Sequence, residues 1–224
     1  DPDGWEGNFP VAYWREEWHD IWLGDDGLIS AVVDAGFDGI YLDWVEAYSD
    51  ENVLAAADED GVDPVVEMTG WVEGLAHTGR DGNPGFLVVG QNAAELAVES
   101  GDYRDTVDAV AQEQVWVDGA ADNDPPGDCP LPRTEADIET EEYVSGLVPG
   151  CRALHDEFPD STLHVSSEWY LEQLTELRDQ GLPVFTVDYA EDPANVAFVL
   201  ETSRSLGFTP FVGTRFLDSY VAPR

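Results

Sequence analysis

Lysine is absent from the 224-residue sequence, whose nine basic residues are all arginine and stand against 48 aspartate and glutamate residues. The formal net charge of −39 argues against nucleic acid or an anionic membrane surface as a partner. A charge of this size destabilises a compact chain unless salt screens it. Since the acidic residues are dispersed and lysine is ordinarily common, we expect a salt-adapted, haloarchaeon-like source in a high-salt environment. The alternative is an ordinary acidic protein.

Long apolar runs are missing as well. No stretch of about 20 apolar residues is present, so we expect no membrane-spanning helix. The sequence shows no signal peptide, yet it begins with Asp1 and not with methionine. We therefore expect a processed product or a fragment, derived from a secreted or cell-surface protein.

Cysteine is nearly absent. Cys129 and Cys151 flank an irregular, proline-rich stretch. They can close one disulfide, which would suit an exported protein, or they can remain two free thiols. The sequence leaves both alternatives open.

Metal-binding patterns are also lacking. The four histidines, residues 19, 77, 155 and 164, show no ligand spacing such as H-x₃-H, so we predict no metal site and no cofactor. The acidic segment 118–150 does not have the spacing of an EF-hand calcium loop. We interpret it as a long solvated loop within an insertion at about 118–160.

Apolar segments with strand character alternate with segments of helical periodicity. We expect strands at 38–44, 85–92, 113–119, 162–169, 183–193 and 209–218. We expect helices at 25–36, 65–80, 93–100, 170–181 and 194–207. This alternation predicts βαβ units and a parallel sheet in one α/β domain spanning 1–224. With 43% hydrophobic residues, the chain can bury a sizeable core.

Polar side chains follow the apolar part of each predicted strand. These residues are Asp43, Gln91, Asn92, Asp118, Asp188, Tyr189, Thr214 and Arg215. The C-terminal edge of parallel strands carries the active site in (β/α)8 barrels, and a similar rule holds for open sheets. No glycine-rich phosphate loop follows a strand, which disfavours nucleotide binding. We therefore expect a functional site at this edge.

Five segments, in this order, resemble those of the glycoside hydrolase 114-like family, which includes the endo-α-1,4-polygalactosaminidases. They are VAYWREEWHDIWLG (11–24), GFDGIYLDWVEAY (36–48), NPGFLVVGQN (83–92), VFTVDYAEDP (184–193) and GFTPFVGTRFLD (207–218). The resemblance covers nearly all of the chain outside 118–160 and implies a (β/α)8 TIM barrel. It also implies about a hundred preceding residues with the first three strands. We therefore expect an incomplete barrel, strands four to eight, as a fragment or as a barrel completed in another way.

Glycosidic cleavage needs two carboxyl groups across the bond. The resemblance implies Asp43 and Glu113 as this catalytic pair. Asp43 lies within a long matching motif, whereas the surroundings of Glu113 diverge, and we expect Glu113 to open its strand. The alternative for Asp43 is a helix N-cap, and the alternative for Glu113 is a solvated surface acid.

The remaining site predictions concern substrate contacts, which we assign to Tyr41, Trp44, Gln91, Asn92, Asp188, Tyr189 and Arg215. Core packing is the alternative for Trp44, and Arg215 is expected to pair with Asp188 or Asp43. The function implied by the resemblance is endo-hydrolysis of an α-1,4-linked galactosamine-containing polysaccharide. The alternatives are a non-catalytic carbohydrate-binding or surface protein on a degenerate barrel, and a TIM-barrel enzyme of another kind, such as a lyase.

Overall fold

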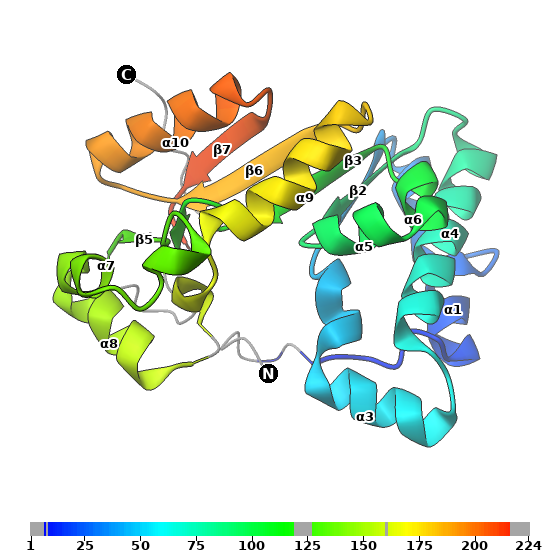
Figure 1. Cartoon of the computed structure of the whole chain (residues 1–224). Helices are drawn as coiled ribbons and strands as arrows, with labels where there is room; N and C mark the ends of the chain where they lie inside the picture. Colours follow the sequence, from blue (N-terminus) through cyan, green and yellow to red (C-terminus); the bar gives the residue numbers. More distant parts are fainter. Residues whose placement is uncertain (1–6, 8, 119–126, 160, 216–224) are drawn as a thin grey trace. The chain divides into compact units, whose positions relative to one another are not determined.

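The computed structural model describes residues 7, 9–118, 127–159 and 161–215 (Figure 1). Its internal contacts group the chain into two compact units, 9–111 and 112–224 with 1–8. The boundary falls within strand β3 (Ala109–Glu113), which contributes residues to both units. A single domain over 1–224 stays a prediction.

The unit 9–111 alternates helices with parallel strands. In chain order it contains α1 (Glu16–Leu23), α2 (Leu28–Asp34), β1 (Gly39–Leu42), the 3-10 helix η1 (Val45–Ser49), α3 (Glu51–Asp60), α4 (Pro64–Gly82), β2 (Leu87–Gln91), α5 (Ala94–Glu99), α6 (Gly101–Thr106) and the start of β3. β1 pairs with β2 and β2 with β3, all in parallel. The predicted strands at 38–44 and 85–92 and the helices at 25–36 and 65–80 are confirmed, while the helix predicted at 93–100 is followed by a second one, α6.

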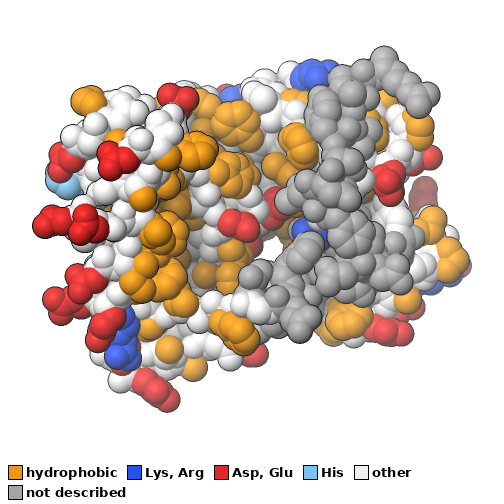
Figure 2. Space-filling model, turned by 180° about the vertical axis from the view of Figure 1, so that it is seen from behind, with side chains coloured by type: hydrophobic (Ala, Val, Ile, Leu, Met, Phe, Trp, Pro, Cys, Tyr) orange, Lys and Arg blue, Asp and Glu red, His pale blue; other side chains and the backbone are white. Residues whose placement is uncertain are grey.

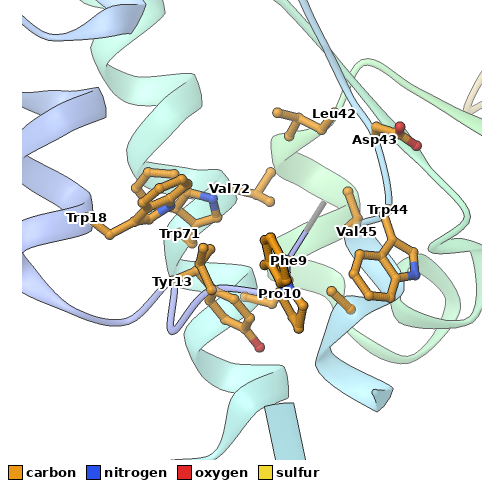
Figure 3. Close-up of a pocket in the computed structure, with 13 residues that line it drawn as sticks. Phe9, Pro10, Tyr13, Trp18, Leu42, Asp43, Trp44, Val45, Trp71 and Val72 are labelled. Atoms are coloured by element: carbon orange, nitrogen blue, oxygen red, sulfur yellow. The ribbon is translucent and has the colours of Figure 1, made fainter. Parts of the chain in front are cut away.

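Helix α4 is the longest element of this unit, and local sequence sets its start. The Asp63 side chain accepts two backbone N–H hydrogen bonds of the first turn, and Pro64 occupies the position where no N–H is needed. Its buried face repeats at helical spacing: Met68, Trp71, Val72, Leu75, Ala76 and Gly79. Trp71 packs against Trp18 of α1, with ring centroids 6.4 Å apart (Figure 3).

The second unit contains two more parallel strands. In chain order it contains the end of β3, β4 (Val117–Asp118), β5 (Cys129–Pro130), the 3-10 helix η2 (Glu135–Asp137), α7 (Glu141–Gly146), α8 (Pro149–Glu157), the 3-10 helix η3 (Thr162–His164), α9 (Ser167–Asp179), β6 (Val184–Tyr189), α10 (Pro193–Ser205) and β7 (Thr209–Gly213). β6 and β7 are parallel, and β4 and β5 form a short antiparallel pair. Helices α9 and α10 pack against β6 and β7 respectively (Figure 1).

The strand predicted at 113–119 is wrong. β3 ends at Glu113, and only Val117–Asp118 form a strand beyond it. The apolar segment between them is buried, but the backbone N–H groups of Trp116 and Val117 donate to Asp188 Oδ1 at 2.7 and 3.0 Å. A buried carboxylate thus takes donors that a neighbouring strand would otherwise use. As a consequence, Glu113 ends its strand instead of opening it.

The strand predicted at 162–169 is also wrong, because this segment forms η3 and the first turn of α9. Two serines decide the outcome. The hydroxyl of Ser161 accepts from Leu163 N at 3.2 Å, and that of Ser166 accepts from Trp169 N at 3.1 Å. Serine satisfies the free N–H groups at a helix start, so these caps outweigh the strand-like pattern between them.

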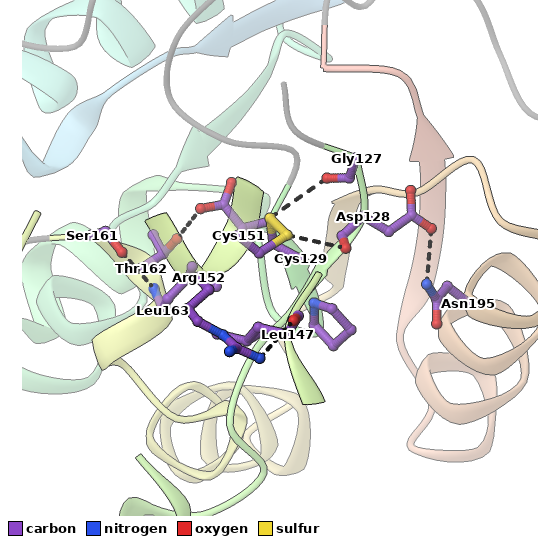
Figure 4. The surroundings of a disulfide bond; sticks show 12 residues. Gly127, Asp128, Cys129, Leu147, Cys151, Arg152, Ser161, Thr162, Leu163 and Asn195 are labelled. Carbon is purple, nitrogen blue, oxygen red and sulfur yellow. Dashed lines mark hydrogen bonds between the residues drawn. A yellow bond between two sulfur atoms is a disulfide. The ribbon is translucent and has the colours of Figure 1, made fainter. Parts of the chain in front are cut away.

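The segment predicted as a solvated loop, 118–150, is largely folded where it is described; residues 119–126 lie outside the described part. A disulfide joins Cys129 of β5 to Cys151 of α8, with a Cα–Cα distance of 5.5 Å (Figure 4). Together with Leu147 and Leu163, the two half-cystines form a small core of their own. The structure therefore resolves the open question about the two cysteines in favour of a bridge.

The acidic surplus is visible on the surface. Figure 2 shows Asp and Glu side chains scattered over the face in view, with few basic ones among them. Within the described residues, no helix is both long and apolar enough to span a bilayer.

Candidate active site

Asp43 and Gln91 lie side by side at the C-terminal ends of β1 and β2. The register pairs Leu42 with Gly90, which makes the next residues of the two strands neighbours. Gln91 Nε2 donates to Asp43 Oδ1 at 2.8 Å. Gln91 is buried, whereas Asp43 is exposed. A buried amide therefore orients one oxygen of a carboxylate that remains accessible. The N-cap of the following helix η1 is Trp44, so the structure does not place Asp43 at the cap.

Glu113 and Tyr189 form a second polar pair, in the unit 112–224. The Tyr189 hydroxyl donates to Glu113 Oε1, and the Arg215 guanidinium lies 4.9 Å from the centroid of the Tyr189 ring. Burial, reinforced by the Glu113 carboxylate, raises the pKa of Tyr189 well above its usual range. The phenol therefore stays protonated and remains a donor. Glu113 is half-buried and held, and is not a freely solvated acid.

The backbone is strained directly after three of the strands. The non-glycine residues with positive φ in the described part are Trp44, Asn92 and Gln114, at 52°, 57° and 54°. Asn92 and Gln114 directly follow the last residues of β2 and β3, and Trp44 directly follows Asp43, the first residue after β1. Left-handed backbone costs such residues on the order of 1–3 kcal/mol and gathers at functional sites. The three bends indicate that the fold keeps the preceding side chains, Asp43, Gln91 and Glu113, in an imposed direction.

A small apolar cavity of about 180 Å³ opens beside Asp43 within the unit 9–111 (Figure 3). Aromatic rings dominate its lining: Phe9, Tyr13, Trp18, Trp44 and Trp71. Asp43 lies at its edge and is the one acidic residue among the lining residues. Apolar walls with a single charged group are typical of ligand sites, which usually measure roughly 300–1,000 Å³. The cavity therefore suits only part of a ligand, and Trp44 forms one of its walls.

Asp188 lies inside its unit and not at the surface. Its relative exposure is 0%, and Oδ2 has no hydrogen-bond partner, although Oδ1 accepts two backbone N–H groups. Burial raises the pKa of Asp188 to about 7, against the lowering effects of these N–H groups and of Arg133. Arg133 is thus a cation that acts on Asp188, and the pairing of Arg215 with Asp188 or Asp43 stays a prediction. This burial favours a role in holding the segment after Glu113 over a direct sugar contact.

We expect the Asp188→Asn variant to be more stable than the wild type at about pH 8, by up to a few kcal/mol. The folded-state pKa lies above the ordinary 3.8. The contribution of neutral Asp188 to the stability of the wild type is therefore complete below about pH 4 and is lost as the pH rises through about 7. Asparagine keeps the Oδ1 acceptor and cannot ionise. Denaturant unfolding at constant salt across this range, with the exposed Asp105→Asn as control, measures the difference; a difference that is independent of pH would contradict the assignment.

The structure sorts the other predicted contacts by unit. In 9–111 it brings Trp44 and Gln91 close to Asp43, places Asn92 directly after β2, and places Tyr41 on β1 with 51% exposure. In 112–224 it brings Tyr189 to Glu113 and Arg215 to the ring of Tyr189. Asp118 lies on β4, where its carboxylate accepts from Gln114 and Thr162. Sequence reasoning missed Arg133, which no motif marks.

A family model and two curated relatives match this chain over half of its length or more. The model of glycoside-hydrolase family GH114 matches residues 1–223. An uncharacterized protein of Deinococcus radiodurans is 33% identical over 221 residues, which are 99% of this chain and 56% of that protein. One of Thermotoga maritima is 30% identical over 116 residues, 50% of this chain and 33% of that protein. The chain thus spans about half or less of the length of these relatives.

Solved structures show the same fold. The glycoside hydrolase domain of PelA from Pseudomonas aeruginosa superposes with a TM-score of 0.57 at 19% identity, covering 93% of this chain and 64% of that one. A Glu-to-Ala variant of that domain gives 0.55 at the same identity and coverage. The fold is therefore of the mixed α/β, TIM-barrel type. With the family model matching 223 of its 224 residues, the chain belongs to glycoside-hydrolase family GH114.

Proposed function

We propose that the protein is an endo-acting glycoside hydrolase that cleaves an α-1,4-linked, galactosamine-containing polysaccharide with Asp43 and Glu113 as its two carboxyl groups. Family membership supports the reaction class. One observation carries the choice of residues. Asp43 directly follows parallel strand β1 and Glu113 ends β3, and each accepts a hydrogen bond from a buried donor and precedes a residue with left-handed backbone.

The chemistry assigned to the pair follows from the bond to be broken. One carboxyl group protonates the glycosidic oxygen as it leaves, and the other, ionised, either attacks the anomeric carbon or activates a water. Gln91 and Tyr189 contribute by holding one oxygen of each carboxyl group in place. A carboxyl separation of about 5–5.5 Å in a substrate complex would mean retention of configuration, and about 6.5–9.5 Å inversion.

The substrate class is supported by charge. Free amino groups make a galactosamine polymer cationic, and the chain carries a formal charge of −39. Opposite charges raise the local concentration of substrate, an effect that salt reduces. The aromatic cavity beside Asp43 provides an apolar wall on which one sugar ring would rest.

The proposed setting is extracellular and saline. The Cys129–Cys151 bridge supports export, because disulfides persist in oxidising compartments. The dispersed carboxylates and the absence of lysine support adaptation to high salt.

The test is release of reducing ends from an α-1,4-linked galactosamine polymer, followed in low and in multimolar salt. Endo-action predicts that polymer length falls early, with oligosaccharides of mixed size as products. Polygalacturonate offers the same linkage with the opposite charge as a control polymer. If the protein retains the galactosamine polymer on a column but releases no reducing ends at any salt concentration, it is the non-catalytic carbohydrate-binding protein instead.

A further inference from the structure

Two histidines and one glutamate converge in the disulfide-bridged part of the unit 112–224. A ring nitrogen of His155, a ring nitrogen of His164 and a carboxylate oxygen of Glu139 all lie within 4.8 Å of one another. The rings of His155 and His164 stack with their centroids 4.2 Å apart. We infer that Glu139, His155 and His164 bind a transition-metal ion of the Zn²⁺ class. This site is independent of the carboxyl pair proposed above.

The hydrogen bonds of the two imidazoles leave one nitrogen of each available to a metal. His164 Nε2 lies 2.9 Å from the His155 carbonyl oxygen, which can only accept, so Nε2 carries the proton and Nδ1 has the lone pair. His155 Nδ1 lies 3.3 Å from Asp156 Oδ1, which leaves its lone pair on Nε2. Histidines that bind metals typically donate their second N–H to a carbonyl or a carboxylate in this way.

His155 Nε2 supplies a second, independent observation. The residue is only 7% exposed, and Nε2 has no hydrogen-bond partner. A buried polar atom without a partner is costly, and such atoms call for an explanation. A bound cation would satisfy this lone pair.

The spacing of the other two ligands already suits a metal. His164 Nδ1 and Glu139 Oε1 are 3.6 Å apart. Bonds of about 2.0–2.2 Å in a tetrahedral zinc site place ligand atoms roughly 3.3–3.6 Å from each other. The Glu139 side chain is 77% exposed, so it can adjust to an ion without disturbing the core. Two histidines and one glutamate also form a known zinc ligand set with an open fourth position.

The surrounding structure fixes both histidines. His155 lies on α8, which the Cys129–Cys151 bridge attaches to β5 (Figure 4). His164 ends η3 directly after Leu163, a member of the disulfide core. A metal bound here would join the segment around Glu139 to these two helices. We therefore expect the ion to stabilise this region against unfolding.

Zinc binding to the metal-free protein, measured by titration calorimetry in molar NaCl with excess Mg²⁺, tests the inference. Magnesium prefers oxygen ligands and occupies surface carboxylates, whereas imidazole selects zinc. We expect one Zn²⁺ per chain, and a Tm that rises with Zn²⁺ and falls back with a chelator. Glu139→Gln and His164→Gln should each weaken binding by at least ~10-fold, since even outer-shell changes at metal sites cost about 10–100-fold.

Matched controls separate this site from general binding to an acidic surface. Glu141→Gln removes an exposed acid close in sequence. His77→Gln removes the histidine of an exposed His77–Asp81 pair in the other unit. Both controls should bind Zn²⁺ like the wild type, and exposed Glu139 can be replaced without a folding defect. The inference is overturned if no zinc binds, or if the control variants lose as much affinity as Glu139→Gln and His164→Gln.

Discussion

Replacing Asp43 by asparagine is expected to lower kcat for polymer cleavage by about 10³-fold, within the ~10²–10⁴ range of an acid–base group. Asparagine keeps the size of the side chain and an oxygen that accepts from Gln91 Nε2. It removes the ionisable group, so the binding of substrate and KM should change little. Initial rates of reducing-end release give both constants.

Asp38 provides the control for this variant. It precedes β1 at the opposite end of the same strand and is exposed, like Asp43. Asp38→Asn should retain the wild-type rate. Equal rates for Asp43→Asn and Asp38→Asn would show that Asp43 takes no part in catalysis.

Glu113→Gln is expected to produce a loss of similar size, about 10²–10⁴-fold in kcat. Glutamine can still accept the hydrogen bond of the Tyr189 hydroxyl, so the local geometry survives while the charge is lost. Tyr189→Phe removes the donor and leaves the carboxyl group, and we expect a smaller loss, about 10-fold, with an altered pH–rate profile. Circular dichroism and kinetics of both variants, beside Glu141→Gln as control, distinguish the roles.

The result that contradicts this role for Glu113 is a specific one. If Tyr189→Phe were as inactive as Glu113→Gln and also less stable, the pair would serve the fold and not the reaction. If Glu113→Gln kept the wild-type rate, the second carboxyl group would have to be another residue.

Where the capping residues and the apolar pattern favour the same element, the sequence predicts the structure. Asp63-Pro64 begins a helix, with the aspartate side chain capping the first turn. Asp192-Pro193 begins α10 in the same way, although we expected a strand over 183–193, which ends at Tyr189 instead. The strand ending before Asp43 and the one ending at Gln91 were predictable from their apolar runs. Distant side chains also contact these elements, since Asp108 accepts from Val88 N and Asp128 from Asp192 N, but these bonds leave the elements where the pattern predicts them.

The prediction that Glu113 opens its strand was wrong because a distant residue binds the backbone of the segment that follows Glu113. The apolar residues around Trp116 resemble a strand, but Asp188, 72 positions away, accepts the N–H group of Trp116. Trp116 instead buries its ring and donates through Nε1 to Ser203. No local pattern announces such a contact. Moving the end of β3 back to Glu113 places this acid at the strand edge where catalytic residues of such folds lie.

The histidine cluster was missed for a similar reason. His155 and His164 are nine positions apart and lie on two successive elements, α8 and η3. The stacking of their rings follows from how α8 and η3 pack around the disulfide core. Spacing rules for zinc sites detect ligands within one element or one turn, and this set has ligands from three segments.

The most direct measurement of the central proposal compares kcat of the wild type, Asp43→Asn, Glu113→Gln and the double variant on one galactosamine polymer. Two carboxyl groups that act on the same bond form a unit, and losses within such a unit are far from additive. We therefore predict that the double variant is within about 10-fold of either single variant. A double variant whose loss equals the product of the two single losses, or single variants that cleave as fast as the wild type, would contradict the proposed pair.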